Sequence, residues 1–515
     1  MYKLCILAAG KGTRNTSVLG LHKALLPLEN QAVISHIIKS VPEDTKIVIA
    51  VGYKSEQVKS YIKTIFPKRD IEFVYVENYD GLTSGPGLSL LQCKNHLQCP
   101  FIFTSADTIV EESFVFDKLQ ENWLGVSFVE EDESLKYCLV QGNKYLDTLY
   151  YGSGNKAFVG IAGIHDYKQF WQSLENNEST RDEYQVTHGF SGLDKIRLID
   201  FTWYDTGNNK SYLETRKKFS NDVVAVKNEE AIFVEEGKVI KYYDDAKKTK
   251  QRIERTSHLN ECIPTVTQIN DNMFCYDYIE GELLSNILDE NVLKDVLVFH
   301  KKTFHNRIYD KSKEFLNDCT DMYYIKTFNR IEHFADSDLD KIQYINGIKV
   351  KGIVDILNDV DWNSIYKNSI PTKFHGDFQP ENIIHNGKDF KLIDWRESFG
   401  SNLEIGDFYY DLGKLYHAIL INGQSVLNEE YEYHINDNNA FIQYNIKSNL
   451  LMLFDHLKMF CKENNFNWDN VELLGILQYV GICSLYKEFH KGKYGEFLFL
   501  LGKYLLTKKL SENIK

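Results

Sequence analysis

Residues 3–14, KLCILAAGKGTR, decide the fold of the first part of the chain. The apolar run over residues 3–8 ends in a glycine-rich turn, which is typical of a buried parallel strand. Helix-like and strand-like runs then alternate: QAVISHIIKSV (31–41), KIVIAVG (46–52), SEQVKSYIKTIF (55–66) and IEFVYV (71–76). This alternation predicts an α/β layer with a mostly parallel sheet, whose ligands gather at the carboxyl ends of the strands.

The character of the sequence changes near residue 220. AIFVEEGKVIKYY (231–243) has two β-rich runs around a Glu-Gly pair and predicts a hairpin. Later segments carry long helical patterns, for instance residues 439–462 and 471–490. A small sheet followed by a helical lobe differs from the first half, so we expect two domains, an α/β domain over residues 1–222 and an α+β domain over residues 223–515.

Composition excludes several classes of function. The 515 residues are 43% hydrophobic, which predicts a globular chain with more than one domain. The net charge of −14 repels a phosphate backbone, and no apolar run approaches the roughly 18 residues that span a bilayer, so we expect neither nucleic acid nor membrane as a partner. Nine cysteines without a CxxC motif, and no export signal, predict reduced thiols and a cytoplasmic location.

The turn after the first strand has the features of a phosphate-binding loop. Gly10 and Gly12 let backbone N–H groups approach an anion, and Lys11, Arg14 and Lys23 add charged donors. Alone, such a turn fits an ordinary strand-to-helix connection about as well.

Three further motifs accompany this loop: TSGPG (83–87), FTSADT (103–108) and WYDTG (203–207). The last two place Asp107 and Asp205 at the ends of apolar strands. Singly, each aspartate fits a strand-end turn residue better. Together, two carboxylates beside a phosphate loop meet the needs of a magnesium site for nucleotidyl transfer, since a metal must neutralise charge at the α-phosphate.

In this order, the motifs LAAGKGTR (7–14), HKALLPL (22–28), TSGPG, SAD and WYDTG resemble the nucleotidyltransferases that make nucleoside-diphosphate sugars and CDP-alcohols, over about residues 1–220. The resemblance implies a Rossmann-like sheet and a set of site residues. Its nucleotide-binding residues would be Ala8, Gly10, Lys11, Gly12 and Gly85, its catalytic cations Arg14 and Lys23, and its Mg²⁺ ligands Asp107 and Asp205. Pro86 and the short loop after Arg14 depart from the common sugar-nucleotide pattern, which leaves the base and the acceptor open.

A second constellation lies in FHGDFQPENII (374–384) and KLIDWRES (391–398). Asp377 and Asn382 have the separation of a catalytic base and a metal ligand on one loop, and Asp394 ends a short apolar strand. The spacing resembles the aminoglycoside phosphotransferase and choline kinase superfamily, which has a protein-kinase-like fold. By that resemblance, Asp377 is the general base, Asn382 and Asp394 bind magnesium, and His375 is structural.

Upstream, the same resemblance implies further ATP contacts. Lys241 would be the phosphate lysine and Glu254 its helix partner, although Lys241 also fits a solvated strand residue. MFCYDYIEGELL (273–284) would be the hinge over adenine, and KFSND (218–222) the loop that covers the phosphates. In GDFYYDLGKLYH (406–417) we expect the acidic and aromatic residues to be structural.

Together the resemblances imply a bifunctional enzyme with small-molecule substrates. One half would phosphorylate a sugar, polyol or amino alcohol with ATP and Mg²⁺. The other would join the product to a second NTP, CTP or UTP, releasing pyrophosphate and giving an activated precursor for a surface polysaccharide. Two alternatives stay open: a choline or ethanolamine kinase joined to a CTP:phosphocholine cytidylyltransferase, and one active half with a regulatory nucleotide-binding half. The acceptor, base, channelling and oligomeric state, including a homo-oligomer, also stay open.

Overall fold

The computed structural model describes residues 2–81, 84–113, 119–176, 184–219, 228–259, 262–335, 337–421, 423–445, 448–487 and 489–512. By its contacts the chain divides into two compact units. The first unit comprises residues 1–246 and 267–275, and the second comprises residues 247–266 and 276–515. Part of the predicted loop KFSND, residues 220–222, lies outside the described residues.

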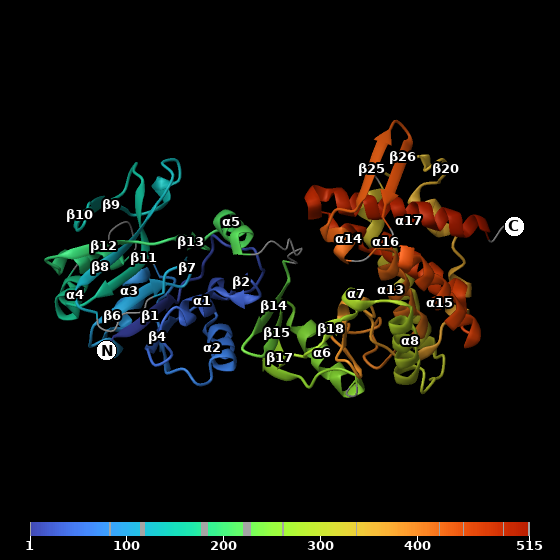
Figure 1. Cartoon of the computed structure of the whole chain (residues 1–515), viewed down its shortest axis with the longest axis horizontal. Helices are drawn as coiled ribbons and strands as arrows, with labels where there is room; N and C mark the ends of the chain where they lie inside the picture. Colours follow the sequence, from blue (N-terminus) through green and yellow to red (C-terminus); the bar gives the residue numbers. More distant parts are fainter. Residues whose placement is uncertain are drawn as a thin grey trace. The chain divides into compact units, whose positions relative to one another are not determined.

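The first unit is built on a sheet of nine described strands, coloured blue to green in Figure 1. Its strands are β1 (Lys3–Ala8), β4 (Lys46–Val51), β5 (Ile71–Tyr75), β6 (Phe101–Ser105), β8 (Asn122–Phe128), β9 (Leu139–Gly142), β10 (Leu146–Tyr150), β11 (Lys156–Ile164) and β12 (Ile196–Asp200). Strands β6, β1, β4 and β5 lie side by side in this order and run parallel, as predicted, and β11 joins β6 antiparallel. The first strand therefore lies in the middle of a parallel sheet.

Helices cover this sheet because each central strand is apolar on both faces. Along β1, Leu4, Ile6 and Ala8 belong to one apolar cluster, and Cys5 and Leu7 belong to another. The helices of the unit are α1 (Val33–Lys39), α2 (Ser55–Ile65), α3 (Pro86–Gln92), α4 (Tyr167–Glu175) and α5 (Asn209–Phe219).

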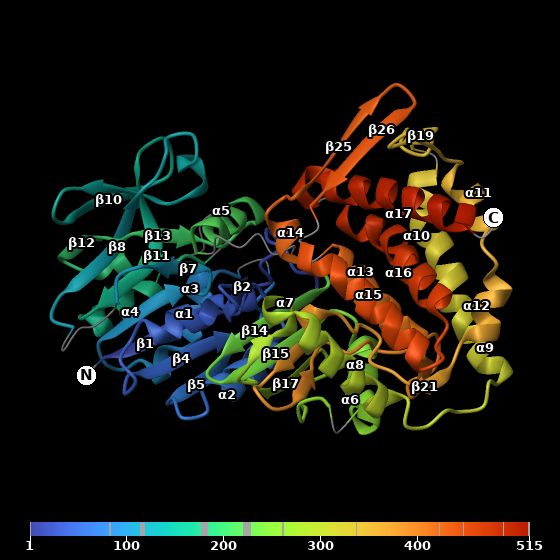
Figure 2. The same ribbon diagram turned by 45° about the vertical axis from the view of Figure 1, so that its right-hand side comes forward.

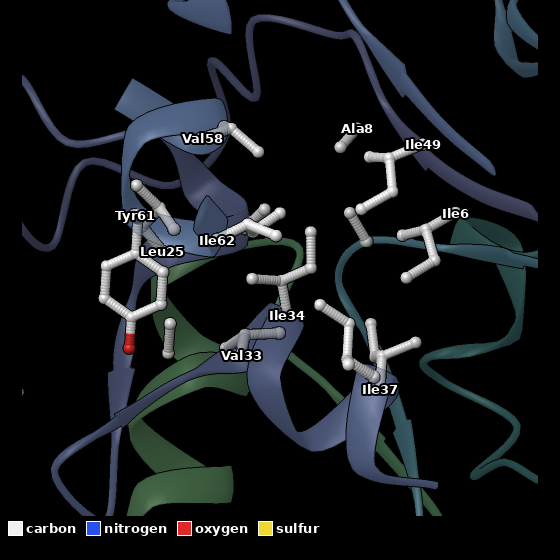
Figure 3. Packing of buried hydrophobic residues seen from close by; sticks show 14 of the residues in the cluster. Ile6, Ala8, Leu25, Val33, Ile34, Ile37, Ile49, Val58, Tyr61 and Ile62 are labelled. Atoms are coloured by element: carbon white, nitrogen blue, oxygen red, sulfur yellow. The ribbon is translucent and has the colours of Figure 1, made fainter. Parts of the chain in front are cut away.

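Figure 3 shows the first of these clusters at close range. Ile6 and Ile49 come from neighbouring strands and pack in one cluster with Ile34 of α1 and Ile62 of α2. All four side chains are almost completely buried. The turn that follows β1 thus begins from a strand that is buried in this cluster.

A short antiparallel ribbon brings the two predicted metal-binding aspartates together. Strand β7 (Thr108–Val110) begins directly after Asp107, and β13 (Trp203–Asp205) ends at Asp205. In the register of this ribbon, Asp205 lies opposite Thr108. Asp107 and Asp205, almost a hundred residues apart in sequence, therefore lie at the same end of this two-stranded ribbon.

The predicted hairpin forms part of a four-stranded sheet in order β14-β15-β17-β16, with β14 (Glu230–Glu235), β15 (Lys238–Tyr243), β16 (Thr267–Asn270) and β17 (Met273–Asp277). Its apolar face packs in the core of the first unit, where Phe233 contacts Tyr61 of α2 at a ring distance of 5.0 Å. Residues 228–246, which the sequence assigns to the second domain, therefore pack with the first unit.

Buried Glu235 also ties this small sheet to the first unit. One carboxylate oxygen accepts hydrogen bonds from the Ser35 and Tyr61 hydroxyls, both at 2.8 Å, and the other lies 2.9 Å from Lys39 Nζ. A buried carboxylate is stable only when it is paired and hydrogen-bonded, and here α1 and α2 supply every partner.

The second unit is mostly helical. Its helices are α6 (Ala246–Leu259), α7 (Leu284–Ile287), α8 (Glu290–Phe304), α9 (Lys313–Thr320), α10 (Lys326–Ala335), α11 (Ile353–Asn358), α12 (Trp362–Asn368), α13 (Phe408–Leu420), α14 (Gly423–Leu427), α15 (Ser448–Glu463), α16 (Trp468–Ile482) and α17 (Lys493–Glu512). Helix α13 is buried along its whole length, and α16 packs against both α13 and α17, as Figure 2 shows.

Short strands complete the second unit: β18 (Glu282–Leu283), β19 (Tyr344–Ile345), β20 (Ile348–Lys349), β21 (Pro371–Lys373), β22 (Ile383–His385), β23 (Phe390–Leu392), β24 (Ile405–Asp407), β25 (Tyr431–Asn436) and β26 (Asn439–Tyr444). The helix predicted over 439–462 is wrong at its start, because residues 439–444 form β26. There Ala440 and Ile442 are buried while Phe441 between them is exposed, which is the two-residue period of a strand.

In the described ranges, no helix has both the length and the apolar character needed to cross a bilayer. The nine cysteines, all of which fall within the described ranges, are free thiols, and seven of them are buried.

Candidate functional site

In the first unit, Gly12 of the glycine-rich turn packs closely against the Lys23 side chain. Gly12 has a φ of +62°, a left-handed conformation that favours glycine, and a Cβ atom there would lie 2.8 Å from Lys23 Cδ. A Cβ on Gly10 would meet nothing within 4 Å, so the backbone is open on that side. Ala8, at the end of β1, is buried. The turn thus leaves room for a ligand and holds a lysine beside it.

Hydrogen bonds join the continuation of this turn to the segment after Asp205. The Asn15 side-chain amide donates to the Thr206 carbonyl oxygen at 2.9 Å, and the Thr16 N–H donates to Asn209 Oδ1 at 2.7 Å. These contacts span about 190 residues of sequence. They keep the phosphate-loop candidate next to the strand end that carries Asp205.

The two aspartates meet around Gly207. A Cβ atom on Gly207 would lie 3.0 Å from Asp205 Oδ1 and 3.2 Å from Asp107 Oδ2, so a larger residue would push into both carboxylates. Lys23 Nζ forms an ion pair with Asp107 Oδ2 at 2.7 Å. The Thr206 N–H donates to the Asp107 carbonyl oxygen at 3.0 Å and links the two strand ends. The structure therefore brings Asp107, Asp205 and Lys23 together.

The pKa values of the two carboxylates shift in opposite directions. Burial acts to raise the pKa of Asp107, but Lys23 at ion-pair distance outweighs it and lowers that pKa. Burial and repulsion from Asp107 raise the pKa of Asp205 above its ordinary value. Asp107 is thus paired with a cation of the chain, whereas no Lys or Arg of the described residues forms an ion pair with Asp205.

This imbalance fits a divalent cation, because such an ion would stabilise the ionised form of Asp205. Among the described residues no group of three or more His, Cys, Asp or Glu side chains could hold a metal ion. A Mg²⁺ ion held by two carboxylates takes its other oxygen ligands from water and substrate phosphates.

Three other predicted residues are placed differently. Lys11 forms an ion pair with Asp80 at 2.7 Å, with both side chains about half exposed. Arg14 is exposed and acts at a distance to lower the pKa of Asp107. Gly85 packs closely on backbone, since a Cβ there would lie 2.5 Å from the Tyr184 carbonyl oxygen. A contact of Gly85 with a base stays a prediction.

Sequence reasoning missed two partners of Asp205. The Ser211 hydroxyl donates to Asp205 Oδ2 at 2.9 Å, and the Tyr137 hydroxyl donates to the same oxygen at 3.3 Å. Ser211 lies six residues after Asp205, in α5, and could have been suspected as a nearby donor. Tyr137 is 68 residues away, and nothing in its local sequence signals this contact.

In the second unit, the predicted catalytic loop follows β21 and is held by Asp411. The His375 N–H donates to Asp411 Oδ2 and the Gly376 N–H donates to Asp411 Oδ1, both at 2.7 Å. Gly376 has a φ of +89°, and a Cβ there would lie 2.6 Å from Arg396 Cβ, so glycine is required. Asp407 likewise accepts from the Tyr323 hydroxyl at 2.7 Å. These contacts agree with the structural role expected for the 406–417 segment.

One short hairpin, formed by β22 and β23, brings Asn382 and Asp394 close together, and a side-chain hydrogen bond joins Asn382 to Asp377. Strands β22 and β23 pair with Ile383 opposite Leu392, and the Ile393 N–H donates to the Asn382 carbonyl oxygen at 2.9 Å. Asn382 before β22 and Asp394 after β23 therefore lie at the same end of the hairpin. The Asn382 side-chain amide donates to Asp377 Oδ2 at 3.1 Å, which leaves its amide oxygen as a candidate metal ligand.

Two basic residues around this loop were not anticipated. Lys414 Nζ pairs with Asp377 Oδ1 at 3.0 Å and, together with His375, keeps the Asp377 pKa low although burial acts to raise it. Buried Arg255 lies on the Phe374 ring at 3.9 Å and donates to loop carbonyl oxygens, including that of Phe374 at 2.5 Å. Lys414 lies one helical turn after Asp411 on α13, a spacing that could have signalled it.

The predicted ATP contacts upstream are spread over both units. Lys241 is buried in β15 of the first unit, opposite Ile232 on β14, which excludes a solvated strand residue. Glu254 lies on α6 of the second unit and pairs with Lys250 on the same helix at 3.8 Å. A Lys241–Glu254 pair stays a prediction.

Comparison with known proteins adds to this geometry. Residues 4–148 match the family model of the MobA-like NTP transferase domain. The bifunctional protein GlmU of Methanococcus maripaludis is 28% identical over 257 residues, covering 46% of this chain and 61% of the relative. GlmU of Methanococcus aeolicus is 24% identical with the same coverage. The chain thus spans less than two thirds of the length of these relatives.

Solved structures also resemble the chain. A UDP-glucose pyrophosphorylase bound to UDP-glucose is 18% identical, with a TM-score of 0.36 over 42% of this chain and 98% of that one. CTP:phosphocholine cytidylyltransferase LicC from Streptococcus pneumoniae is 18% identical, with a TM-score of 0.37 over 42% and 99%. These low values carry no argument about what the chain does. The range matched by the MobA-like NTP transferase model, residues 4–148, includes the first strand, the glycine-rich turn and Asp107.

Proposed function

We propose that the first unit transfers a nucleotidyl group from an NTP to a phosphomonoester and releases pyrophosphate. This proposal rests on the positions of Asp107 and Asp205, which lie close together beside Lys23 and the Gly10–Gly12 turn. The match of residues 4–148 to the MobA-like NTP transferase domain supports it. The NTP is CTP or UTP, as expected from the sequence.

The residues of the first unit have distinct roles in this reaction. The Gly10–Gly12 backbone and Arg14 bind the triphosphate, and Lys23 neutralises charge beside Asp107. The acceptor phosphate attacks the α-phosphorus in line, so no side chain has to act as a nucleophile. Asp107 and Asp205 would hold Mg²⁺, which supplies charge neutralisation at the α-phosphate when bound.

The second unit, in this proposal, phosphorylates a small alcohol with ATP. Its supporting observation is the placement of Asp377, Asn382 and Asp394 around one hairpin end. Asp377 accepts the hydroxyl proton of the alcohol, while Asn382 and Asp394 would hold Mg²⁺, which would neutralise phosphate charge when bound. Lys241 and Glu254 are the proposed ATP-phosphate lysine and its partner.

The two reactions fit in sequence, because a kinase makes a phosphomonoester and the transferase consumes one. The product would be an NDP-activated precursor for a surface polysaccharide, made in the cytoplasm from small molecules. One alternative is a choline or ethanolamine kinase joined to a CTP:phosphocholine cytidylyltransferase. The other is a single active unit joined to a nucleotide-sensing unit; the complete acidic sets in both units weigh against it.

Paired variants test this assignment. Asp107→Asn should abolish pyrophosphate release from a supplied phosphomonoester and spare ADP release, and Asp377→Asn should do the reverse. Exposed Asp147→Asn is the matched control and should leave both activities unchanged. Products are identified by mass spectrometry with ATP, each NTP, Mg²⁺ and a panel of sugars, polyols and amino alcohols. Unchanged ATP turnover in Asp377→Asn would refute the assigned base. Reaction with phosphomonoesters, but with no alcohol, would refute the coupled sequence.

A further inference from the structure

The Asp205 carboxylate is held by donors on both of its oxygens. Oδ2 accepts hydrogen bonds from the Ser211 hydroxyl at 2.9 Å and from the Tyr137 hydroxyl at 3.3 Å, and the Asn208 side-chain amide lies 3.5 Å from it. Oδ1 accepts from the Gly207 N–H at 2.8 Å. The two hydroxyls therefore converge on one oxygen, and the carboxylate cannot rotate without breaking these bonds.

The longer of these contacts comes from a residue that is fixed by packing. The Tyr137 ring meets the Trp203 ring edge to face, with the ring centres 5.1 Å apart. Both rings pack against a small apolar cluster formed by Val129, Leu139 and Ala157. Trp203 lies on β13, the strand that ends at Asp205. The Tyr137 hydroxyl is thus held beside the end of this strand by side chains that are themselves packed.

Gly207 leaves open the space between the two carboxylates of the site. A Cβ atom there would lie 3.0 Å from Asp205 Oδ1 and 3.2 Å from Asp107 Oδ2, so these two oxygens face the same point. The φ angle of Gly207 lies outside the left-handed region, so its backbone conformation is open to other residues. What glycine provides at this position is room, and room between two carboxylate oxygens suits a cation.

An ordinary turn accounts for only part of this arrangement. An aspartate in a turn bonds the backbone N–H two residues on, as Asp205 does with Gly207. Such a turn needs no second carboxylate at the same point. Lys23 Nζ pairs with Asp107 Oδ2 at 2.7 Å, so one positive charge of the chain faces two negative charges. The remaining repulsion between Asp107 and Asp205 is relieved when a cation binds between them.

We propose that Ser211, Tyr137 and Gly207 position the metal-binding carboxylates of the first unit. The two hydroxyls hold Asp205 Oδ2, which directs Oδ1 toward Asp107. Gly207 keeps the space between the carboxylates open for a divalent cation. The inference rests on the nucleotidyl transfer proposed above and adds positioning residues to its site. Removal of such a donor to a metal ligand costs about 10- to 100-fold in metal affinity.

The test measures Mn²⁺ binding to the full chain by electron paramagnetic resonance, which needs no turnover. Every protein also carries Asp394→Asn, so that the proposed metal site of the second unit does not contribute, and Asp107→Asn defines the signal that belongs to the first unit. Gly207→Ala should raise the Kd for Mn²⁺ about tenfold or more, because its Cβ fills the space. Exposed Gly81→Ala is the matched control, since a Cβ there would meet nothing closer than 3.5 Å.

Two further variants remove single oxygen atoms and retain both carboxylates. Ser211→Ala should raise the Kd for Mn²⁺ about tenfold or more, and Tyr137→Phe should raise it less because its hydrogen bond is longer. Exposed Ser191→Ala and Tyr75→Phe are the matched controls and should leave the Kd unchanged. These two variants decide the outcome if Gly207→Ala does not fold. An unchanged Kd in both would overturn the positioning role, and an unchanged Kd in folded Gly207→Ala would overturn the role of the open space.

Pyrophosphate release separates this inference from the proposed activity. The expected changes in Kd, without pyrophosphate release from any NTP and phosphomonoester, would support the positioning residues and refute nucleotidyl transfer. Pyrophosphate release, with the same Kd for Mn²⁺ in all three variants as in the parent, would overturn the inference and leave the transfer activity standing. Absence of Mn²⁺ binding by the parent chain would also overturn it.

Discussion

Replacing Asp411 with asparagine tests how the loop before Asp377 is held. Both carboxylate oxygens of Asp411 accept backbone hydrogen bonds at 2.7 Å, from His375 and from Gly376, and the side chain is fully buried. Asparagine has nearly the same shape but only one oxygen. Its amide group must therefore face one of the two N–H groups, and that buried donor loses its acceptor.

The cost follows from the number of donors left without a partner. One buried donor without an acceptor costs about 1–3 kcal/mol, so Asp411→Asn should lower the free energy of unfolding of the second unit by that amount. Asp411→Ala leaves both backbone donors without an acceptor and also removes the carboxylate that lies 3.4 Å from buried His300 Nε2, so it should cost at least about 2–6 kcal/mol, a large part of the roughly 5–15 kcal/mol that stabilises a domain. Proposed ATP turnover should fall as well, because a displaced loop moves Asp377 away from Lys414.

Urea unfolding followed by tryptophan fluorescence measures this change, since Trp395 is buried in the second unit and reports on it. Asp295→Asn, an exposed position on α8, is the matched control and should unfold like the original chain. An Asp411→Asn protein within about 0.5 kcal/mol of the original, with full ATP turnover, would refute the assigned role of this carboxylate.

Three other changes give separate checks. Glu235→Gln should destabilise the first unit by about 1–3 kcal/mol in urea unfolding, because Lys39, which is partly exposed and keeps Glu236 at 3.1 Å, loses its charged partner and the glutamine keeps only one acceptor oxygen. Glu236→Gln at the exposed neighbour should have little effect; equal effects would contradict the anchoring role. Lys23→Met should lower kcat/KM for pyrophosphate release about 10- to 100-fold, and an unchanged value would remove Lys23 from the site. His417 has a pKa of about 3 in the fold, because of burial and then of Lys414, against about 6.5 when unfolded. The unfolded chain binds this proton first as pH falls, so the free energy of unfolding should decrease below pH 6.5 by up to about 1.4 kcal/mol per pH unit, and His417→Gln should flatten that slope.

Local pattern was sufficient where the site is built from neighbouring residues. The spacing between Asp377 and Asn382 and the short strand before Asp394 predicted one acidic cluster, and the β22–β23 hairpin brings those residues to one end. The interval between them is short enough for a single hairpin to determine their proximity. The meeting of Asp107 and Asp205 was also predictable, because both end apolar strands.

Contacts between distant segments were not predictable in the same way. Tyr137 reaches Asp205 across 68 residues, and Arg255 reaches Phe374 across 119. Neither residue has a local pattern that distinguishes it from other surface tyrosines or helical arginines. Side-chain partners of this kind depend on how elements pack, which periodicity does not encode.

The amino-acid sequence alone determined the α/β character of the first half, the glycine-rich turn after β1 and the acidic residues of both candidate sites. The tertiary structure decided which core covers each apolar face. The hairpin over residues 230–243 was recognisable from its pattern, but only packing showed that Phe233 and Glu235 join the first unit. An alternating pattern specifies that a strand has an apolar face, whereas the surface that buries this face is selected by shape and charge complementarity over the whole fold.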